Sequence, residues 1–409
     1  MFLAPNHAFV RARPDGLAPD RPNPGRGRNV TPEERELYRA TMRDFVEREV
    51  LPAAEELDRH GEFPHRLFAR LAELGCFGLR YPEPLGGQDA DFQTACVLYE
   101  ELAAGSLSLA AITAMQGLMG TVFVHRFGSP EQHARYLTPA LRGEKVGTFA
   151  LTEPEAGSDL GAMRTRARRT PAGGWRLTGT KTWITSAPVA DFLTVGAKTT
   201  DEPGIKDIAL FLLDAATPGY EVGRPIEKLG TRSSLTSEVH LDCEVPADAL
   251  LGGEGQGVRN VGGTLSEIRV MTAALATGLA RRALQDSAAY AKERQAFGRP
   301  IGEFQLVAAK LANMATELHA ARLATADAAA RIDAGADVTT VAAMAKYFAT
   351  EVCARIVDEA TRIFGSYGFA MEYAAQRYFR DARFLLYGGG TSEILQGLIG
   401  RDVVKRGGW

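Results

Sequence analysis

The sequence predicts an α+β protein with an N-terminal helical domain, a small central β-sheet or barrel domain and a C-terminal four-helix bundle. Changes in the apolar pattern are the basis for this prediction. Apolar residues recur at helical spacing over residues 31–148, alternate as in strands over 149–260, and return to long helical repeats over 261–409. A chain of 409 residues is long enough for two or three such domains.

The chain begins with a proline-rich segment. Residues 1–30 contain five prolines and several arginines but no apolar stretch like that of a signal peptide, so we predict a disordered or loosely attached arm. The first helix is expected to begin after Thr31. Thr31 can cap the helix, Pro32 suits the first helical position, and Glu34 can return the second bond of a capping box.

The middle of the chain has the patterns of short strands. Residues 237–245 alternate strictly between apolar and polar side chains, as a half-buried strand does, and residues 208–213 form a continuous apolar run. Pairs of Gly and Pro separate these runs, which is typical of tight turns. We therefore expect a compact β domain over residues 149–260.

The C-terminal part has three long helical patterns, near residues 264–293, 303–333 and 338–364, followed by a shorter one from about residue 391. A helix of 30 residues spans about 45 Å, which is the length scale of a four-helix bundle.

Composition excludes several classes of function. A net charge of −3 argues against a nucleic-acid partner, and no histidine or cysteine pair has metal-ligand spacing. The four scattered cysteines indicate buried, reduced thiols and a cytoplasmic protein. No uninterrupted apolar run reaches the roughly 18 residues that a membrane span needs.

Four segments have residue types suited to binding a cofactor. Each also has a plain structural interpretation, as a polar turn, a core tryptophan, an interhelical turn or a glycine loop. Arginine in the third can pair with phosphate oxygens, and glycines in the fourth let a ligand approach the backbone. The segments are LTEPEAGSD at 151–159, KTWITS at 181–186, ERQAFGRPIGEFQ at 293–305, and YGGGTSE at 387–393.

Other common nucleotide and catalytic motifs are absent. The sequence contains no strict GxGxxG or Walker A motif, which disfavours a Rossmann or P-loop site. It also lacks the GxSxG elbow of many hydrolases.

In their order and spacing, these four segments resemble the acyl-CoA dehydrogenase family. The likeness extends over about residues 31–405 and includes the PEPLGG turn at 82–87, KLGTRS at 228–233 and Arg380-Asp381. The resemblance implies FAD as cofactor, an acyl thioester of coenzyme A or a carrier protein as substrate, and a role in fatty acid or amino acid catabolism. It also implies a homo-oligomer, with a tetramer expected, and an electron-transfer flavoprotein as electron acceptor.

The resemblance also assigns residues to the flavin. Part of each site is implied to come from a neighbouring subunit, which would contribute the residues near 294–305. The implied FAD contacts are Leu151, Thr152, Gly157, Ser158, Trp183, Ile184, Thr185, Arg294, Phe297, Gln305, Arg362, Gly365, Ser366, Thr391 and Glu393.

The sequence departs from the family pattern at the base that removes the substrate α proton. The commonest position for this carboxylate is Gly389, and the alternative position, directly before Arg269, is Ile268. Glu267 is the nearest carboxylate, so we predict it as the base, although it could simply favour the start of the first bundle helix electrostatically. The residues implied to contact substrate are Ser158, Arg269, Gly389 and Gly390.

Because of this departure, two further functions stay open. One is another flavin reaction on the same fold, such as oxygenation or elimination from a thioester, and the other is a catalytically silent subunit. Arg80 could contact a polar end of the acyl group, but we interpret it as a solvated side chain.

Overall fold

The computed structural model describes residues 28–408, and most of the predicted N-terminal arm lies outside them. The first helix begins as the sequence predicts. The hydroxyl of Thr31 accepts from the backbone N–H of Glu34, the Glu34 carboxylate accepts from the N–H of Thr31, and Pro32 is the first helical residue. The N-terminal helices are α1 (Pro32–Phe45), α2 (Ala54–His60), α3 (His65–Glu73), α4 (Phe92–Gly105), α5 (Leu107–Ala114), α6 (Val122–Phe127), α7 (Pro130–Gln132) and α8 (Thr138–Leu141).

The central domain is one mixed sheet. Its strands are hydrogen-bonded in the order β6-β7-β3-β2-β4-β5-β8, and β1 pairs with β4 in parallel. The alternating segment predicted at 237–245 lies in β7, and Val239, Leu241, Cys243 and Val245 are all buried. The strands are β1 (Gly147–Ala150), β2 (Arg166–Arg169), β3 (Trp175–Thr185), β4 (Phe192–Lys198), β5 (Ile208–Asp214), β6 (Tyr220–Pro225), β7 (Thr236–Val245) and β8 (Leu250–Leu251).

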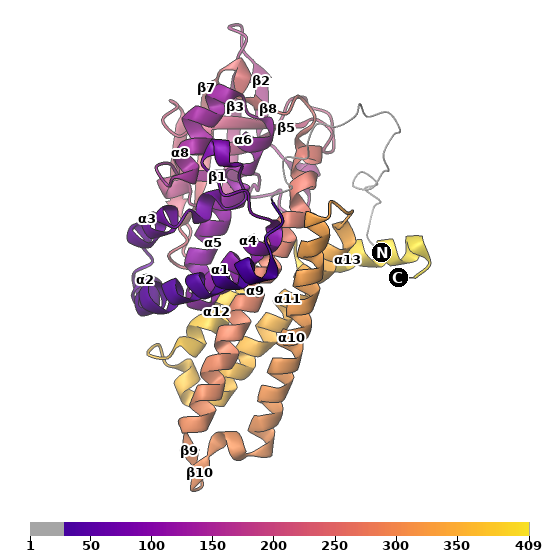
Figure 1. Ribbon diagram of the computed structural model, residues 1–409. Helices are drawn as coiled ribbons and strands as arrows, with labels where there is room; N and C mark the ends of the chain where they lie inside the picture. The colour runs from indigo at the N-terminus through magenta and orange to yellow at the C-terminus, as the bar shows by residue number, and fades with distance from the viewer. Residues whose placement is uncertain (1–27, 409) are drawn as a thin grey trace.

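Long helices form the C-terminal part. Helix α9 alone has 37 residues, and it packs against α4, α10 and α11. In Figure 1 the bundle extends away from the sheet domain, so the β9–β10 hairpin lies at the opposite end of the molecule. These elements are α9 (Gly257–Glu293), β9 (Gln295–Ala296), β10 (Arg299–Pro300), α10 (Gln305–Asp333), α11 (Thr339–Phe364), α12 (Ala374–Leu385) and α13 (Ser392–Arg406).

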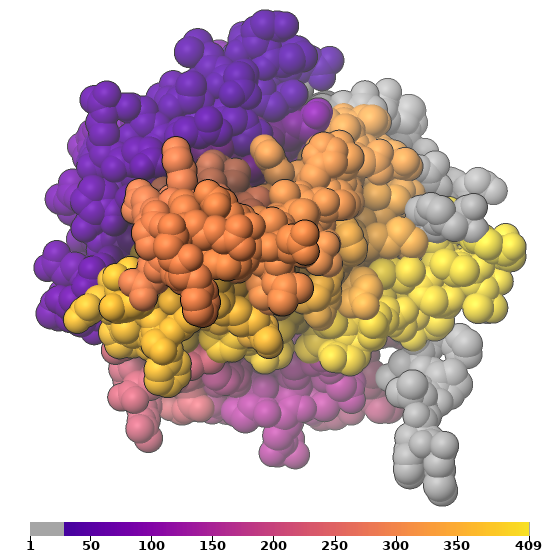
Figure 2. Space-filling view, turned by 90° about the horizontal axis from the view of Figure 1, so that it is seen from below, coloured from indigo at the N-terminus to yellow at the C-terminus, as the bar shows by residue number. Residues whose placement is uncertain are grey.

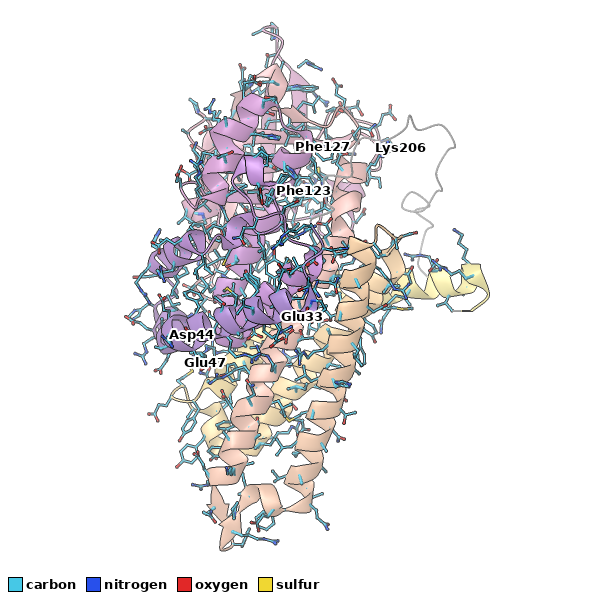
Figure 3. All side chains as sticks on the ribbon, in the orientation of Figure 1. Glu33, Asp44, Glu47, Phe123, Phe127 and Lys206 are labelled. Carbon is cyan, nitrogen blue, oxygen red and sulfur yellow. The ribbon has the colours of Figure 1, made fainter. Side chains whose placement is uncertain are left out.

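One helical stretch, Leu107–Phe127, is long and apolar enough to cross a membrane. The sequence criterion missed it because polar residues such as Thr113 and Gln116 interrupt the apolar run. The structure buries 94% of its most apolar window inside the protein, so it forms core. At its end, Phe123 and Phe127 of α6 lie on the side of the sheet domain (Figure 3), and the Phe123 ring is 4.8 Å from that of Phe149.

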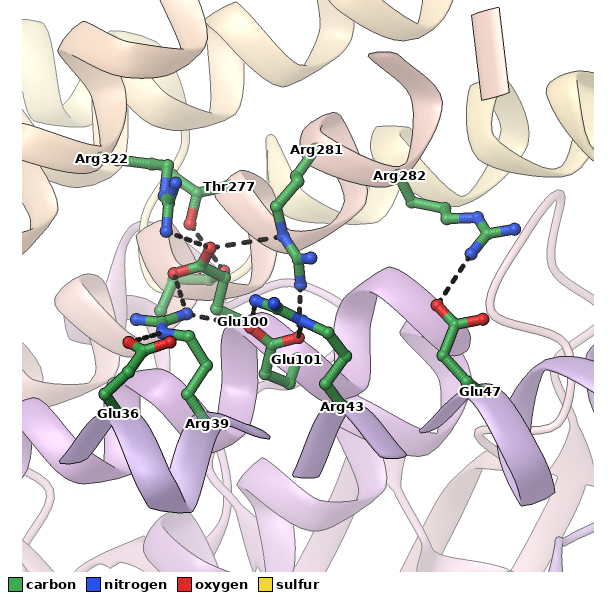
Figure 4. Close-up of polar contacts among 11 residues, drawn as sticks. Glu36, Arg39, Arg43, Glu47, Glu100, Glu101, Thr277, Arg281, Arg282 and Arg322 are labelled. Atoms are coloured by element: carbon green, nitrogen blue, oxygen red, sulfur yellow. Dashed lines mark hydrogen bonds and ion pairs between the residues drawn. The ribbon is translucent and has the colours of Figure 1, made fainter. Parts of the chain in front are cut away.

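A buried charge cluster joins the N-terminal helices to the bundle (Figure 4). We call it the Glu100–Glu101 cluster, after the two adjacent acids of α4. The Glu101 carboxylate, 1% exposed, pairs with Arg39 at 2.9 Å, Arg43 at 3.2 Å and Arg281 at 2.7 Å. Glu100 pairs with Arg322 of α10 at 3.0 Å. The cluster therefore links α1, α4, α9 and α10.

All four cysteines are buried and free, as predicted. Among residues 28–408, no group of three His, Cys, Asp or Glu side chains is arranged to hold a metal ion.

Candidate active site

A buried ion pair fixes the position of the loop that follows β1. The Lys181 ammonium, fully buried, donates to the Glu153 carboxylate at 2.8 Å and to the carbonyl of Leu151 at 3.0 Å. Burial, partly opposed by Glu153, lowers the pKa of Lys181 to about 8. Glu153 also accepts from the backbone N–H groups of Arg164 and Thr165, so the loop is rigidly placed.

Part of this loop is exposed to solvent. Gly157 and Ser158 are exposed, and Thr152 is half-buried. Within the described residues, the backbone N–H groups of Thr152, Gly157 and Ser158 have no hydrogen-bond partner. Such N–H groups can bind the polar edge of a ligand.

Trp183 lies next to this loop because the N–H of Thr182 donates to the carbonyl of Thr152 at 2.9 Å. The pairing of β3 with β7 is irregular between Lys181 and Ile184, and Trp183 there has a φ of 61°. A bulky residue rarely adopts this left-handed conformation, which marks strain of the kind found at ligand sites. The indole is 58% exposed, whereas Ile184 beside it is buried and Thr185 is half-buried. An exposed indole beside free N–H groups fits a flat ring with a polar edge, such as a flavin.

A lysine of α11 holds the glycine-rich turn before α13 in place. The Lys346 ammonium, fully buried, donates to the carbonyls of Leu386 at 3.1 Å and Gly390 at 2.8 Å. Burial lowers the pKa of Lys346 to about 8. Thr391 caps α13, and Glu393 lies in its first turn. Both Gly389 and Gly390 have positive φ, of 72° and 107°, which glycine adopts without strain.

Arg269 is a buried cation beside this turn. Its side chain is 5% exposed, and its one hydrogen bond in the described structure is a long one, from Nε to the carbonyl of Gly389 at 3.4 Å. No carboxylate of residues 28–408 pairs with it, and burial lowers its pKa to about 10. A Cβ atom at Gly389 would meet no atom closer than 3.6 Å, where it would approach Ile268 and Thr272. The site therefore has room for one further carbon atom at Gly389, next to an unpaired guanidinium.

Glu267, the predicted base, lies on α9 between two arginines. Its carboxylate oxygens pair with Arg80 at 2.8 Å and Arg126 at 2.7 Å, and Arg126 also donates to the Thr264 hydroxyl at 2.8 Å. Burial raises the pKa of Glu267, but the two guanidinium groups outweigh it and hold the pKa below its usual value. A base must be free to accept a proton, so these ion pairs weigh against the predicted role.

The interpretation of Arg80 as solvated was wrong. Its side chain is 11% exposed and lies over the ring of Phe92, with its guanidinium carbon 4.5 Å from the ring centroid. Arg80 is at the end of a buried apolar segment of the N-terminal domain, so only a small part of its side chain reaches water.

The remaining predicted flavin residues lie near the far end of the bundle. Phe297 is 95% exposed with a φ of 51°, and the Arg294 guanidinium lies 5.6 Å from the centroid of the Tyr367 ring. Figure 2, seen from below, shows this end of the bundle uncovered by the other domains. The structure thus brings Leu151, Thr152 and Trp183 together but leaves a second group far from them, comprising Arg294, Phe297, Gln305, Arg362, Gly365 and Ser366.

Three site residues were given no role from the sequence: Lys346, Arg126 and Lys181, the last of which begins the KTWITS segment. Lys346 offered a signal, because it lies at helical spacing on the face that buries Ala342, Ala349 and Cys353. A lysine on such a face must bond to carbonyls or acids within the protein.

Comparison with known proteins identifies the family. The N-terminal, middle and C-terminal domain models of acyl-CoA dehydrogenases match residues 32–144, 148–243 and 255–404. The chain belongs to the acyl-CoA dehydrogenase family. Members of this family are FAD-containing oxidoreductases that act on CH–CH bonds of acyl-CoA, so the predictions of family, fold class, enzyme class and FAD are confirmed.

Several relatives are similar over most of this family member. A benzylmalonyl-CoA dehydrogenase from Aromatoleum aromaticum is 47% identical, over 92% of this chain and 99% of its own. CarC, a subunit of the caffeyl-CoA reductase–Etf complex of Acetobacterium woodii, is 36% identical, over 91% and 99%. The structure of butyryl-CoA dehydrogenase from Megasphaera elsdenii superposes with a TM-score of 0.89 at 34% identity, over 92% and 99%.

Proposed function

We propose that this enzyme oxidises an acyl-CoA thioester that has a carboxylate on its α carbon, and that the carboxylate leaves as CO2. The observation behind the proposal is the buried, unpaired Arg269 next to Gly389, which has no side chain. A substrate carboxylate would supply the ion partner that Arg269 lacks. A guanidinium suits this role because its planar N–H groups bind carboxylates in pairs.

The proposed reaction needs no base at position 389. When the bond between the α carbon and the carboxylate breaks, CO2 departs and the electron pair stays on the α carbon, stabilised by the thioester. FAD supplies the acceptor for the hydride that leaves the β carbon. The products are an α,β-unsaturated acyl thioester, CO2 and the flavin reduced by two electrons. Burial of the site favours this step, because the localised charge of the carboxylate becomes spread over the α carbon and the thioester as CO2 leaves.

The name of the most similar relative reported above agrees with this substrate class. A benzylmalonyl thioester has a benzyl group and a free carboxylate on its α carbon, and the Aromatoleum protein is 47% identical to this chain. We infer that the substrate here is also an α-carboxylated acyl-CoA, used in the catabolism of acids in the cytoplasm.

FAD would be held by two copies of the chain. We propose that the flavin ring lies against Thr152, Ser158 and Trp183 of one subunit, near Thr391 and Glu393. The far end of the bundle of a second subunit would then bind the pyrophosphate and adenosine through Arg294, Phe297 and Gln305. This arrangement is supported by the separation of the two groups within one chain. A homotetramer would contain such pairs.

Two other parts of the site follow from the proposal. Ser158 and Gly390 would contact the thioester, with Arg269 and Gly389 on the side of the α-carboxylate. An electron-transfer flavoprotein would reoxidise the enzyme, as the Etf complex of the CarC relative suggests.

The test compares two thioesters that differ only in the α-carboxylate, benzylmalonyl-CoA and 3-phenylpropanoyl-CoA. We expect the first to bleach the flavin under anaerobic conditions and to release one CO2 per flavin. Arg269→Gln should slow the bleaching by benzylmalonyl-CoA. Arg259→Gln, an exposed change on the same helix, should not slow it. Bleaching by 3-phenylpropanoyl-CoA at the same rate, without CO2 release, would overturn the proposal.

A further inference from the structure

A small cavity adjoins the Glu267 ion pairs. Arg80, Arg126 and Glu267 form its charged side, and His125, Leu118 and Val122 are among the other residues lining it. It encloses about 20 Å³ of free space. A space of this size holds about one water-sized oxygen atom.

The cavity has a surplus of positive charge and of hydrogen-bond donors. Two guanidinium groups face one carboxylate, and His125 is neutral because burial lowers its pKa to about 4. Within the described residues, the Arg80 guanidinium donates a single hydrogen bond, to Glu267, out of its five N–H groups. The imidazole of His125 makes no hydrogen bond there; its ring contacts are with Tyr81 and His133. An oxygen placed in the cavity can accept from Arg80 and donate to Glu267.

The cavity and the Gly389 part of the site both border the same stretch of α9. Glu267 directly precedes Ile268, which would border a side chain at Gly389, and Arg269, which bonds to Gly389. Adjacent residues of a helix are separated by a rise of 1.5 Å. The side chains of Glu267 and Ile268 point about 100° apart around α9, so an acyl group whose α carbon lies at Gly389 would have to bend past Ile268 to reach the cavity. Leu118 and Val122 provide apolar wall within the cavity itself.

We propose that this cavity binds a hydroxyl group at the far end of the acyl chain, so that the preferred substrates are hydroxyaryl acyl thioesters. The inference rests on the proposed function only in requiring that an acyl thioester binds beside Gly389. Arg80 is then a specificity residue, and Glu267 and Arg126 hold it in place. The hydroxyl would replace a water, exchanging one set of hydrogen bonds for another, and gain from the charged partners.

The experiment measures binding and not turnover, so it does not depend on CO2 release. The FAD-loaded enzyme is titrated with two unsaturated thioesters, phenylacrylyl-CoA and 4-hydroxyphenylacrylyl-CoA, and the change in flavin absorbance gives each Kd. We expect the hydroxylated thioester to bind about tenfold more tightly, the effect of one hydrogen bond to a charged group. Equal Kd values in the unmodified enzyme would overturn the inference, even if decarboxylation were confirmed.

Variants then identify the cavity as the origin of the preference. Arg80→Met should remove the preference, so that the two Kd values become about equal. Arg48→Met, a change of an exposed arginine, should leave the preference intact. Arg80→Gln serves if Arg80→Met does not fold. Its amide can still donate to Glu267, which Arg126 also pairs with, so the fold should tolerate the change while the guanidinium is lost. An undiminished preference in either folded variant would contradict the assignment.

Discussion

The Glu100–Glu101 cluster and the Glu267 ion pairs are built from the same residue types but differ in where their extra positive charge lies. In the first, Arg43 and Arg322 are 47% and 42% exposed, so part of the charge reaches water. In the second, Arg80 and Arg126 are 11% and 17% exposed, and a cavity adjoins them. In the Glu100–Glu101 cluster water can solvate the extra positive charge, so we interpret this cluster as structural. Beside the Glu267 ion pairs the extra positive charge borders a cavity, where a ligand could pair with it.

The largest expected effect is that of Glu267→Gln. If Glu267 holds the two arginines in place, its loss leaves two buried cations without a counter-charge and costs about 3–5 kcal/mol of unfolding free energy. Urea unfolding measures this loss, and Glu62→Gln, an exposed change, is the control.

The same variant tests the predicted base. A general base contributes roughly 10²–10⁴-fold, so anaerobic flavin reduction would then slow by at least about a hundredfold. Unchanged stability together with such slow reduction would establish Glu267 as the base and remove the contrast between the two clusters.

A second change addresses the cluster without a cavity. Glu101→Gln should destabilise the protein by about 3 kcal/mol, because Glu101 is buried between three arginines. Acyl-CoA binding by the folded protein should not change. A titration of flavin absorbance measures the binding, and a weakened Kd for both thioesters would show that this cluster also influences the site.

His125 gives the second region a sensitivity to mild acid. Burial, with His133, Arg126 and Arg80 nearby, lowers its pKa from 6.5 to about 4 against the attraction of Glu267. The unfolded chain therefore binds a proton that the folded chain does not between these values, and the stability present above pH 6.5 is lost as the pH falls toward 4.

Replacing this imidazole should reduce that loss. We expect the Tm of His125→Gln to fall less steeply with acidification than that of the unmodified protein, while the exposed change His60→Gln leaves the slope as it was. Identical slopes in all three proteins would mean that the pKa of His125 is the same in the folded and unfolded states.

The smallest effect should come from Arg322→Met. This arginine pairs with Glu100 at 3.0 Å but is 42% exposed, so its loss should cost less than about 1 kcal/mol. Thermal unfolding measures it. A cost equal to that of Glu101→Gln would mean that exposure does not separate the two clusters.

Much of this architecture could be read from the sequence because it depends on local patterns. The capping box at Thr31 and the alternation in β7 involve neighbours along the chain. The pairings around the site do not. Arg126 and Glu267 are 141 residues apart, and Lys346 bonds to Gly390 across 44. Only the fold determines that these charges meet, so sequence patterns could propose Glu267 as a free carboxylate but could not reveal its two partners.

The length of helix α9 sets the distance between the two ends of the molecule. Its 37 residues span about 55 Å, with Arg269 in its first half and Arg294 at its end. Removing four residues between them would shorten this distance by about 6 Å and rotate the far end by about 40°. The contacts of α9 with α4, α10 and α11 would shift with it, and the surfaces that we propose two copies match would no longer face each other. A change in the length of this helix would therefore disturb a flavin site shared between two copies.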